Sequence, residues 1–472
     1  MQSIWKHDLE IHQKEAVTEQ AKAEQPMTEK PIANGKNVHT LIIGAGMAGI
    51  LTAYLLKQKG IDAMIVEAKT IASGQTENTT AKITSQHDIF YNKLLQKTGR
   101  KRAKSYAMAN EEAIRIFEQI IRKENIDCEF EKKPAYLYTL NKERIPELQN
   151  EAKVAKMLGI DAKYVEGKEI SELPFEVKGA VRFQEQAQFH PLKFVMHLAK
   201  ELNIYENTKV LSVKGHRVET NQGIIWAENI IFACHYPITN VPGFYFLRQH
   251  QERSYVLALE SKKKLEGMYY SVDTEGLSLR SAGNALLLGG GAHRTGKKLC
   301  QLSDHEQEKY GYRYLRKMAE VYYKENAEIT HWSAQDCMPH DEIPFIGKYS
   351  LLRPYWYVAT GFKKWGMTAS MVSAMIISSQ ITGSTNLYEA TFTPQRLLFR
   401  AGIKNFLVDL GESVMGLAKG LFGKKERRCT HMGCLLEWNN EEDSWDCPCH
   451  GSRFEKNGEL RDNPAQIDIK QK

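Results

Sequence analysis

Residues 41–67 read LIIGAGMAGILTAYLLKQKGIDAMIVE. In this stretch an apolar run ends in a glycine-rich turn, and an amphipathic segment follows that Gly60 can terminate as a helix. A second apolar run then ends on the acid Glu67. Strand, glycine turn, helix, strand and acid in this order are what a dinucleotide-binding βαβ unit requires, so we predict one here.

The three glycines of the turn have separate roles in such a unit. Gly44 permits the tight turn, Gly46 lets a pyrophosphate approach the backbone, and Gly49 lets the helix pack closely on the strand. The helix N-terminus offers free N–H groups and a positive dipole end to the phosphates. Glu67 follows about 20 residues later, where an acid accepts hydrogen bonds from ribose hydroxyls. An ordinary glycine turn in a βα unit is the competing interpretation.

Length and composition indicate a soluble protein of more than one domain. The 472 residues exceed one simple core, and the chain is 42% hydrophobic and 26% charged. A net charge of +7 is small for this length and does not favour nucleic acid as a partner. Residues 1–37 contain no apolar signal segment, and no apolar run is long enough to span a membrane. We therefore expect a cytosolic location.

Patterns along the chain predict four successive stretches. They are a flexible lead-in over residues 1–37, a main domain over 38–390, a linker helix over 391–428 and a small module over 429–472. In the main domain, residues 70–86 have the Thr, Ser, Asn and Gly content of an ordered loop, and residues 100–124 show helical spacing. Short β-rich runs over 209–290 predict an antiparallel sheet, inserted after the nucleotide unit, in a substrate subdomain over roughly 128–290.

The stretch over residues 399–428 reads FRAGIKNFLVDLGESVMGLAKGLFGKKERR. Its apolar residues can share one face of a helix, and its end is basic. Such a helix can lie on a membrane surface or can dock on protein as a linker. We favour the docked linker.

The C-terminal cysteines and histidines form the most specific pattern in the sequence. A C-x-H motif at Cys429 and His431 precedes a C-x-x-H motif at Cys447 and His450. Two cysteines and two histidines can bind zinc. Two such loops can also hold a [2Fe–2S] cluster, in which each loop gives one Cys to one iron and one His to the other. A C-x-H pair differs from the C-x-x-C knuckle of most structural zinc sites, which favours the cluster.

These two motifs closely resemble the Rieske family, because Gly433, Pro448, Gly451 and Ser452 match as well. The resemblance implies that Cys429 and Cys447 bind one iron and that His431 and His450 bind the other. It also implies a disulfide between Cys434 and Cys449, as in Rieske proteins of the cytochrome bc type. The sequence departs from the family in one respect, since few residues separate the linker helix from the first motif. A module of roughly 40 residues rarely folds alone. Either the chain carries a deletion or the main domain supplies the missing support.

The first part of the chain resembles the D-amino-acid-oxidase-type FAD-dependent oxidoreductases. The resemblance rests on the βαβ unit with Glu67, on IASGQTENTTAKITSQH at 71–87, and on DCMPHDEIPFIG at 336–347 followed by YWYVATGFKKWGMTAS at 355–370. It implies an α/β FAD-binding Rossmann-like domain with an inserted antiparallel-sheet substrate domain, followed by a small all-β Rieske-like module. The residues expected to line FAD are Ser73, Gly74, Thr79, Thr80, Gly361, Gly366, Met367 and Thr368.

The resemblance also implies an activity, the oxidation of a carbon–nitrogen bond of an amine or amino acid. The chain contains one complete GxGxxG, so one nucleotide and an organic electron donor fit better than a reductase that uses NAD(P)H. Reduced flavin would pass electrons to the [2Fe–2S] cluster and then to an unknown acceptor. The residues expected near the substrate are Arg253, Tyr255, His293 and Arg294, with His87, Lys364 and Trp365 as further candidates beside the flavin.

Two other functions fit the same residues. The chain could be an electron-transfer protein whose flavin takes electrons from a protein partner, without a small-molecule substrate. It could also be a flavin oxidase with a non-functional Rieske tail, as the missing strands before Cys429 suggest. An ordered pocket over the flavin favours an enzyme, and a flat charged face beside the cluster favours a carrier.

Overall fold

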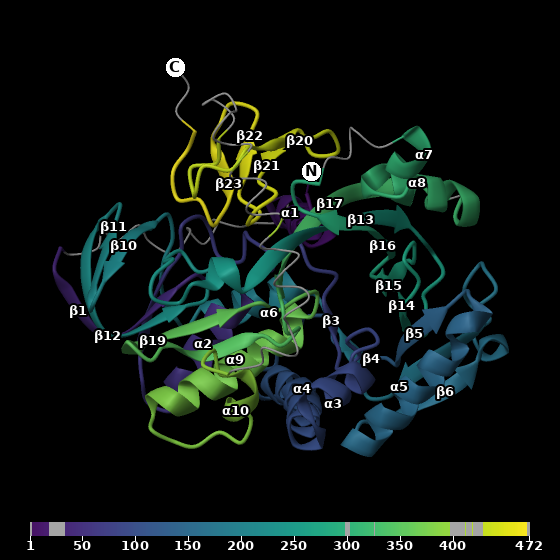
Figure 1. Cartoon of the computed structure of the whole chain (residues 1–472), viewed down its shortest axis with the longest axis horizontal. Helices are drawn as coiled ribbons and strands as arrows, with labels where there is room; N and C mark the ends of the chain where they lie inside the picture. Colours follow the sequence, from purple (N-terminus) through teal and green to yellow (C-terminus); the bar gives the residue numbers. More distant parts are fainter. Residues whose placement is uncertain are drawn as a thin grey trace.

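The computed structural model describes residues 2–17, 34–297, 303–324, 326–396 and 428–469, together with Gly411 and Ala418. Two large sheets form a main domain (residues 34–396), and a small C-terminal module (residues 428–469) lies against it, drawn in yellow in Figure 1. Most of the predicted linker helix over 391–428 falls outside the described residues.

The first sheet has eight strands and begins with the predicted βαβ unit. β1 lies at its centre, parallel to both β2 and β12, and β12 is in turn parallel to β19. Its strands are β1 (Lys36–Ile43), β2 (Ala63–Val66), β9 (Asn203–Tyr205), β10 (Val210–Lys214), β11 (Arg217–Thr220), β12 (Gly223–Phe232), β18 (Phe345–Ser350) and β19 (Arg353–Thr360).

Helices α2 and α9 pack against each other beside this sheet, and α4 packs on α9 (Figure 1). Both α2 and α9 are apolar and buried along nearly their whole length, as expected for helices enclosed between layers. The helices of the described chain are α1 (Ile4–Val17), α2 (Met47–Gln58), α3 (Tyr91–Thr98), α4 (Arg100–Lys123), α5 (Ile145–Leu158), α6 (Pro191–Ala199), α7 (Asp304–Gln307), α8 (Gly311–Tyr322), α9 (Gly366–Ile381) and α10 (Glu389–Phe392).

The second sheet also has eight strands and is mostly antiparallel. Its two faces are covered differently, since one packs toward the helices and the first sheet and the other packs under α8. Its strands are β5 (Ala135–Thr139), β6 (Ala162–Glu166), β7 (Gly179–Phe183), β13 (Gln249–Glu260), β14 (Met268–Ser271), β15 (Ser278–Ala282), β16 (Ala285–Arg294) and β17 (Glu328–Pro339). A small third sheet joins β3 (Lys82–Ile83), β4 (Glu131–Lys132) and β8 (Ala187–Gln188).

The strands over residues 210–232 differ from the prediction for the inserted sheet. β10, β11 and β12 belong to the first sheet, and the second sheet instead extends to β17. Strands of either sheet would have the same β-rich sequence pattern, so only the long-range pairing of β12 with β1 shows that these strands belong to the first sheet.

The lead-in predicted as flexible over 1–37 also differs in part, because residues 4–17 form α1. Ile4 and Trp5 are buried, and the Trp5 indole donates to the Thr79 carbonyl oxygen at 2.7 Å. The Arg280 guanidinium lies 5.1 Å from the Trp5 ring. Residues 1–37 are mostly polar, and two neighbouring apolar side chains give no periodic signal, which is why the sequence did not predict this helix.

The C-terminal module contains a four-stranded antiparallel meander. Its strands are β20 (Glu437–Asn439), β21 (Ser444–Asp446), β22 (Arg453–Glu455) and β23 (Leu460–Asp462). Its apolar interior is small and consists largely of the four C-terminal cysteines with Leu436, Phe454 and Ala465.

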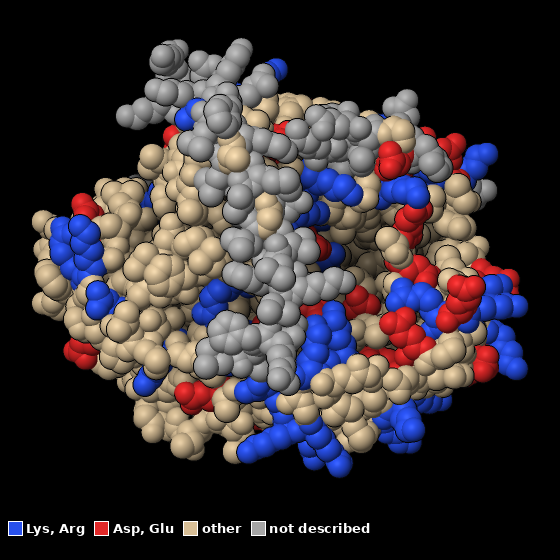
Figure 2. Space-filling view, viewed as in Figure 1, with Lys and Arg blue, Asp and Glu red and all other residues tan. Residues whose placement is uncertain are grey.

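On the face shown in Figure 2, Lys and Arg gather along the lower edge, near α3 and α4 of Figure 1. Elsewhere on this face basic and acidic side chains are interspersed. In the described part of the chain, no helix has both the length and the apolar composition needed to cross a bilayer.

Replacing Trp5 with Ala should destabilise the protein by about 3 kcal/mol, because the substitution leaves a cavity and removes the hydrogen bond to the Thr79 loop. Thermal unfolding of the full chain measures the effect. Ile11→Ala is the matched control, since Ile11 lies on the same helix but is 40% exposed. Equal melting temperatures for the two variants would show that α1 does not contribute to the core.

Candidate functional site

The glycine turn has the geometry predicted for it. Gly44 has φ +110°, and a Cβ there would lie 2.6 Å from the Ala233 carbonyl oxygen at the end of β12. A Cβ on Gly49 would lie 2.0 Å from the Gly44 carbonyl oxygen, so only glycine allows α2 to approach the turn so closely. The N-cap of α2, Gly46, offers no side-chain cap, and Gly46, Met47 and Ala48 line the cavity beside the helix N-terminus.

Two side chains hold this turn in place. Glu67 accepts hydrogen bonds from the backbone N–H groups of Ala45 (2.8 Å) and Lys69 (2.9 Å). Each carboxylate oxygen retains a lone pair, so this arrangement is compatible with the predicted ribose contact. Thr76 accepts a hydrogen bond from the Met47 N–H at 2.9 Å. Thr76 lies within the Thr-rich loop predicted over residues 70–86, but its contact with α2 joins residues too far apart in the sequence for a local pattern to indicate it.

A cavity of about 760 Å³ extends from the glycine turn to the N-terminus of α9. Its volume and the helix N-terminus beside it suit an elongated dinucleotide such as FAD. The predicted FAD residues that line it are Gly44, Gly46, Glu67, Ser73, Gly74, Thr79, Thr80, Gly366 and Met367.

Three predicted FAD residues lie just outside this lining. Gly49 lies where α2 contacts the backbone of the glycine turn, and Gly361 packs against Pro339. Thr368 is buried and donates to the Thr84 carbonyl oxygen at 3.2 Å. Their direct roles in cofactor binding stay predictions.

The cavity wall contains charged groups that the sequence analysis did not single out. Lys82 donates hydrogen bonds to the Tyr269 carbonyl oxygen and to the Ser278 hydroxyl, both at 2.7 Å. Burial lowers the pKa of Lys82 to about 7. Asp336 accepts from the Ser254 hydroxyl at 3.2 Å, and burial raises the pKa of Asp336 to about 6.

The predicted substrate residues lie together, but their polar atoms bond away from the cavity. Although Arg253 borders the cavity, its Nε and Nη2 atoms donate to the Glu442 carboxylate of the C-terminal module, at 2.8 and 2.5 Å. Tyr255 also borders the cavity, and its hydroxyl is 2.8 Å from His293 Nε2, whose Nδ1 faces the Arg294 carbonyl oxygen. Substrate roles for these four residues stay predictions.

The other candidates beside the flavin pack in the same region. His87 stacks on Trp365 with ring centroids 4.9 Å apart, and burial lowers the His87 pKa to about 3. Lys364 pairs with Glu252 at 3.3 Å. His87 is therefore a neutral core side chain, whereas Lys364 and Trp365 line the cavity.

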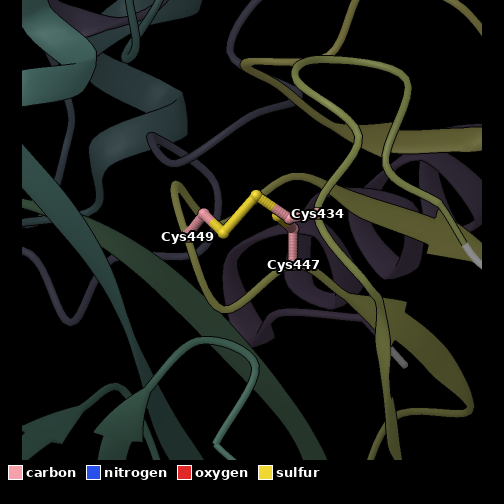
Figure 3. Close-up of side chains that lie close together, drawn as sticks. All are labelled: Cys434, Cys447 and Cys449. Atoms are coloured by element: carbon pink, nitrogen blue, oxygen red, sulfur yellow. A yellow bond between two sulfur atoms is a disulfide. The ribbon is translucent and has the colours of Figure 1, made fainter. Parts of the chain in front are cut away.

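The two cysteine and histidine motifs form two similar loops. The Gly433 N–H donates to the Cys429 carbonyl oxygen, and the Gly451 N–H donates in the same way to Cys447, both at 2.9 Å. A disulfide between Cys434 and Cys449 joins the loops (Figure 3). This bond is the one implied by the Rieske resemblance.

The four predicted cluster ligands lie on these loops as a pair of cysteines and a pair of histidines. The thiols of Cys429 and Cys447 are hydrogen-bonded to each other, which lowers the pKa of Cys429. The rings of His431 and His450 have centroids 5.1 Å apart. Within the described chain, His431 Nδ1 is buried and has no hydrogen-bond partner. Two thiols beside two imidazoles, one with an uncommitted nitrogen, are the donor set that a Rieske [2Fe–2S] cluster requires.

His431 is oriented by the main domain. Its Nε2 lies 3.0 Å from the side-chain oxygen of Asn240. An amide oxygen only accepts, so Nε2 carries the proton and Nδ1 presents its lone pair. Nothing in the sequence around Asn240 indicates this role, because the contact joins residues 191 positions apart.

Glutamines of the main domain hold the second loop. Gln251 Nε2 donates to the His450 carbonyl oxygen, and Gln335 Nε2 donates to that of Gly451, both at 2.7 Å. The two glutamines also bond to each other at 2.6 Å. The Gln335 N–H in turn donates to Gln75, in the loop that lines the cavity. The main domain thus supplies support that the small module lacks.

A dinucleotide cradle and a Rieske ligand set in one chain define a flavoprotein with an iron–sulfur module. The family model "FAD dependent oxidoreductase" matches residues 39–380, and that of the "Rieske [2Fe-2S] domain" matches residues 418–471. The chain belongs to the FAD-dependent oxidoreductase family and carries a C-terminal Rieske domain. Its cofactors are FAD and a [2Fe–2S] cluster.

One curated relative matches almost the whole chain. It is the "Putative Rieske 2Fe-2S iron-sulfur protein YhfW" of Bacillus subtilis (strain 168), 35% identical over 479 residues, with 91% of this chain and 92% of that protein covered. Solved structures share the fold of the main domain. L-proline dehydrogenase from P. horikoshii has a TM-score of 0.64 at 17% identity and covers 77% of this chain and 98% of its own. Glycine oxidase from Bacillus cereus ATCC 14579 has a TM-score of 0.60 at 19% identity, and the match covers 76% of this chain and 99% of the glycine oxidase chain.

Substitution of Asn240 should shift the reduction potential of the cluster. A hydrogen bond from His431 to an oxygen makes the imidazole a better donor and stabilises oxidised iron. Asn240→Leu should therefore raise the midpoint potential, and Asn240→Asp should lower it. Redox titration followed by EPR measures both. Equal shifts in the two variants would assign the effect to altered docking instead of to this hydrogen bond.

Glu442→Gln should cost about 3 kcal/mol at neutral pH, because Arg253 would become a buried charge without a counterion and Arg453 would lose one of its three acidic partners. Burial alone would raise the pKa of Glu442, but the two arginines outweigh it and hold the pKa well below its usual range. Its stabilisation is therefore complete above about pH 4.3, the value in unfolded chains, and is lost as the pH falls below it.

Denaturant unfolding at several pH values measures this effect. The difference between wild type and Glu442→Gln should shrink in acid. Glu459→Gln, an exposed residue of the same module, is the control and should match wild type throughout. A constant difference between Glu442→Gln and wild type down to about pH 3 would contradict the assignment.

Proposed function

We propose that this oxidoreductase oxidises a carbon–nitrogen bond of an amine or amino acid and that the electrons leave through the Rieske cluster. The observation that carries the proposal is the pair of opposite charge centres in the cavity wall, Lys82 and Asp336. FAD bound in this cavity would supply a hydride acceptor, and the [2Fe–2S] cluster would supply a one-electron outlet.

Lys82 suits a substrate carboxylate. In the described part of the chain, no carboxylate lies within ion-pair distance of the Lys82 Nζ atom. Two other lysines of the cavity wall, Lys363 and Lys364, each form an ion pair with a glutamate. A buried ammonium group without a counterion is costly, and a carboxylate ligand would offset that cost. Its two hydrogen bonds fix the direction in which the remaining N–H can point.

Asp336 suits the amino group of the same substrate. With a pKa raised to about 6 by burial, the carboxyl group changes charge close to neutral pH. A group with such a pKa can hold an ammonium ion and can accept a proton from it, which amine oxidation requires. The Ser254 hydroxyl orients it.

The position of the module supports the cluster as the electron outlet. The flavin cavity is lined in part by Arg453 and Asp462 of the Rieske module, and the Gln251–Gln335 pair links its second loop to the wall. An electron carrier without a small-molecule substrate stays an alternative, as does an oxidase with an inactive tail. The ordered, charged pocket favours the enzyme.

The first experiment is an anaerobic absorbance and low-temperature EPR measurement on the purified protein. Flavin bands, together with a reduced signal of low average g, are expected after dithionite. Addition of amines and amino acids without dithionite should then bleach the flavin and produce the same signal. Bleaching without an iron signal would indicate a flavin oxidase with an inactive tail, and peroxide formation would confirm it. Bleaching by no amine would contradict the proposed substrate class.

Lys82 should make carboxylate binding dependent on pH. Because its pKa is about 7 in the free protein, the charged form is lost above that pH. Benzoate, which cannot be oxidised at nitrogen, should bind about tenfold more weakly near pH 8 than near pH 6. Perturbation of the flavin absorbance measures the affinity. Lys82→Arg should remove the pH dependence, and Lys82→Met should weaken binding at both values. Unchanged binding in Lys82→Met would exclude this role.

A further inference from the structure

We infer that the Rieske module forms one wall of the FAD site, at the adenosine end, so that FAD binding and module docking are thermodynamically coupled. The inference concerns cofactor binding and does not depend on the substrate. It rests on the residues that line the cavity beyond the glycine turn.

The adenosine end is defined by Glu67, which lies where ribose is expected. Around it the main domain contributes Lys69, Thr208 and Lys209 to the wall of the cavity. Residues from the Rieske module line the same cavity, namely Leu460, Arg461, Asp462, Asn463, Ala465 and Gln466, and Gln466 lies beside Lys209. A dinucleotide that fills this cavity therefore contacts both parts of the chain.

Hydrogen bonds at this end join the two parts of the chain directly. Lys209 Nζ donates to the Gln466 carbonyl oxygen at 3.0 Å. Asn463 Nδ2 donates to the carbonyl oxygens of Tyr236 (2.9 Å) and Cys234 (3.3 Å). Each bond spans more than 200 positions in the sequence, so each exists only when the module is docked.

Cys234 and Tyr236, whose carbonyl oxygens accept from Asn463, belong to a backbone segment that also supports the phosphate-binding turn. A Cβ on Gly44 would lie 3.2 Å from Cys234 Cα, so this backbone packs directly on the glycine turn. Module docking thus fixes the backbone against which the turn is formed. Since the turn binds the pyrophosphate, loss of docking weakens the cradle even where the module does not contact FAD.

The module also brings a positive charge to the wall. Arg461 reaches the carboxylates of Glu442 and Glu455 only at 3.7 Å each and donates one long hydrogen bond, of 3.4 Å, to the Glu442 carbonyl oxygen, and its side chain is 27% exposed. A guanidinium held so loosely can turn toward an anionic cofactor. Its loss should weaken FAD binding without disturbing the close ion pairs of the module.

The coupling works in both directions. A ligand that binds only the docked state stabilises docking by the same free energy that docking adds to ligand binding. FAD should therefore protect the module from local opening, and an undocked module should lower the affinity for FAD.

The test uses the full-length protein after removal of its flavin, titrated with FAD and followed by flavin fluorescence quenching. Asn463→Ala should raise the Kd for FAD about tenfold, since it removes two hydrogen bonds. Arg461→Ala should also raise it and provides a second variant if Asn463→Ala does not fold. Asn440→Ala, an exposed amide in the β20–β21 turn, is the matched control and should not change the Kd.

Hydrogen exchange supplies the reciprocal measurement. In the wild type, FAD should slow amide exchange over residues 460–466, and exchange in α5 of the main domain, which does not line the cavity, should not change. The protection should diminish in Asn463→Ala. The inference is overturned if both variants bind FAD within about twofold of wild type, and equally if FAD leaves exchange over 460–466 unchanged.

Discussion

Glu442 is a carboxylate that folding removes almost entirely from water, and the assembled protein depends on how its charge is balanced. Its counterions come from two parts of the chain, since Arg253 belongs to the main domain and Arg453 to the Rieske module. Arg453 is in turn held by Asp446 and Asp462. Such a network is favourable only when complete, because any missing partner leaves a buried charge. The module is therefore either fully docked or strongly destabilised, which suits a unit whose own apolar interior is so small.

Strand β13 separates the two cofactor sites and serves both. Side chains alternate between the faces of a strand. On one face Ser254 and Val256 belong to the flavin side, and on the other Arg253 and Tyr255 face the module and α8. The sheet that forms the wall of the substrate cavity thus also forms the platform for the cluster. This arrangement fixes the relative position of the cofactors through the backbone of one strand.

Features encoded by neighbouring residues could be predicted from the sequence. The βαβ unit, the helix over 100–124 and the two cluster motifs depend on local periodicity or spacing, and the structure reproduces them. Features that depend on partners distant in the sequence could not be predicted in this way. The ion pair of Arg253 joins residues 189 positions apart, and strands β10–β12 belong to the first sheet instead of the predicted inserted sheet because β12 pairs with β1. The same applies to Asn240 and Lys82, whose roles come from what surrounds them in space.

The close approach of the two backbones at the interface has a consequence for the history of this architecture. A Cβ on Gly296 of the main domain would lie 2.4 Å from the Pro448 nitrogen, and one on Gly451 would lie 2.6 Å from the Gln251 side chain. No larger residue fits at either position without displacing the module. The surface of the module is therefore closely matched to the surface of the main domain at these two contacts. A shift of either backbone at these contacts would have to be matched by a shift of the other, so we expect substitutions on the two surfaces to occur together.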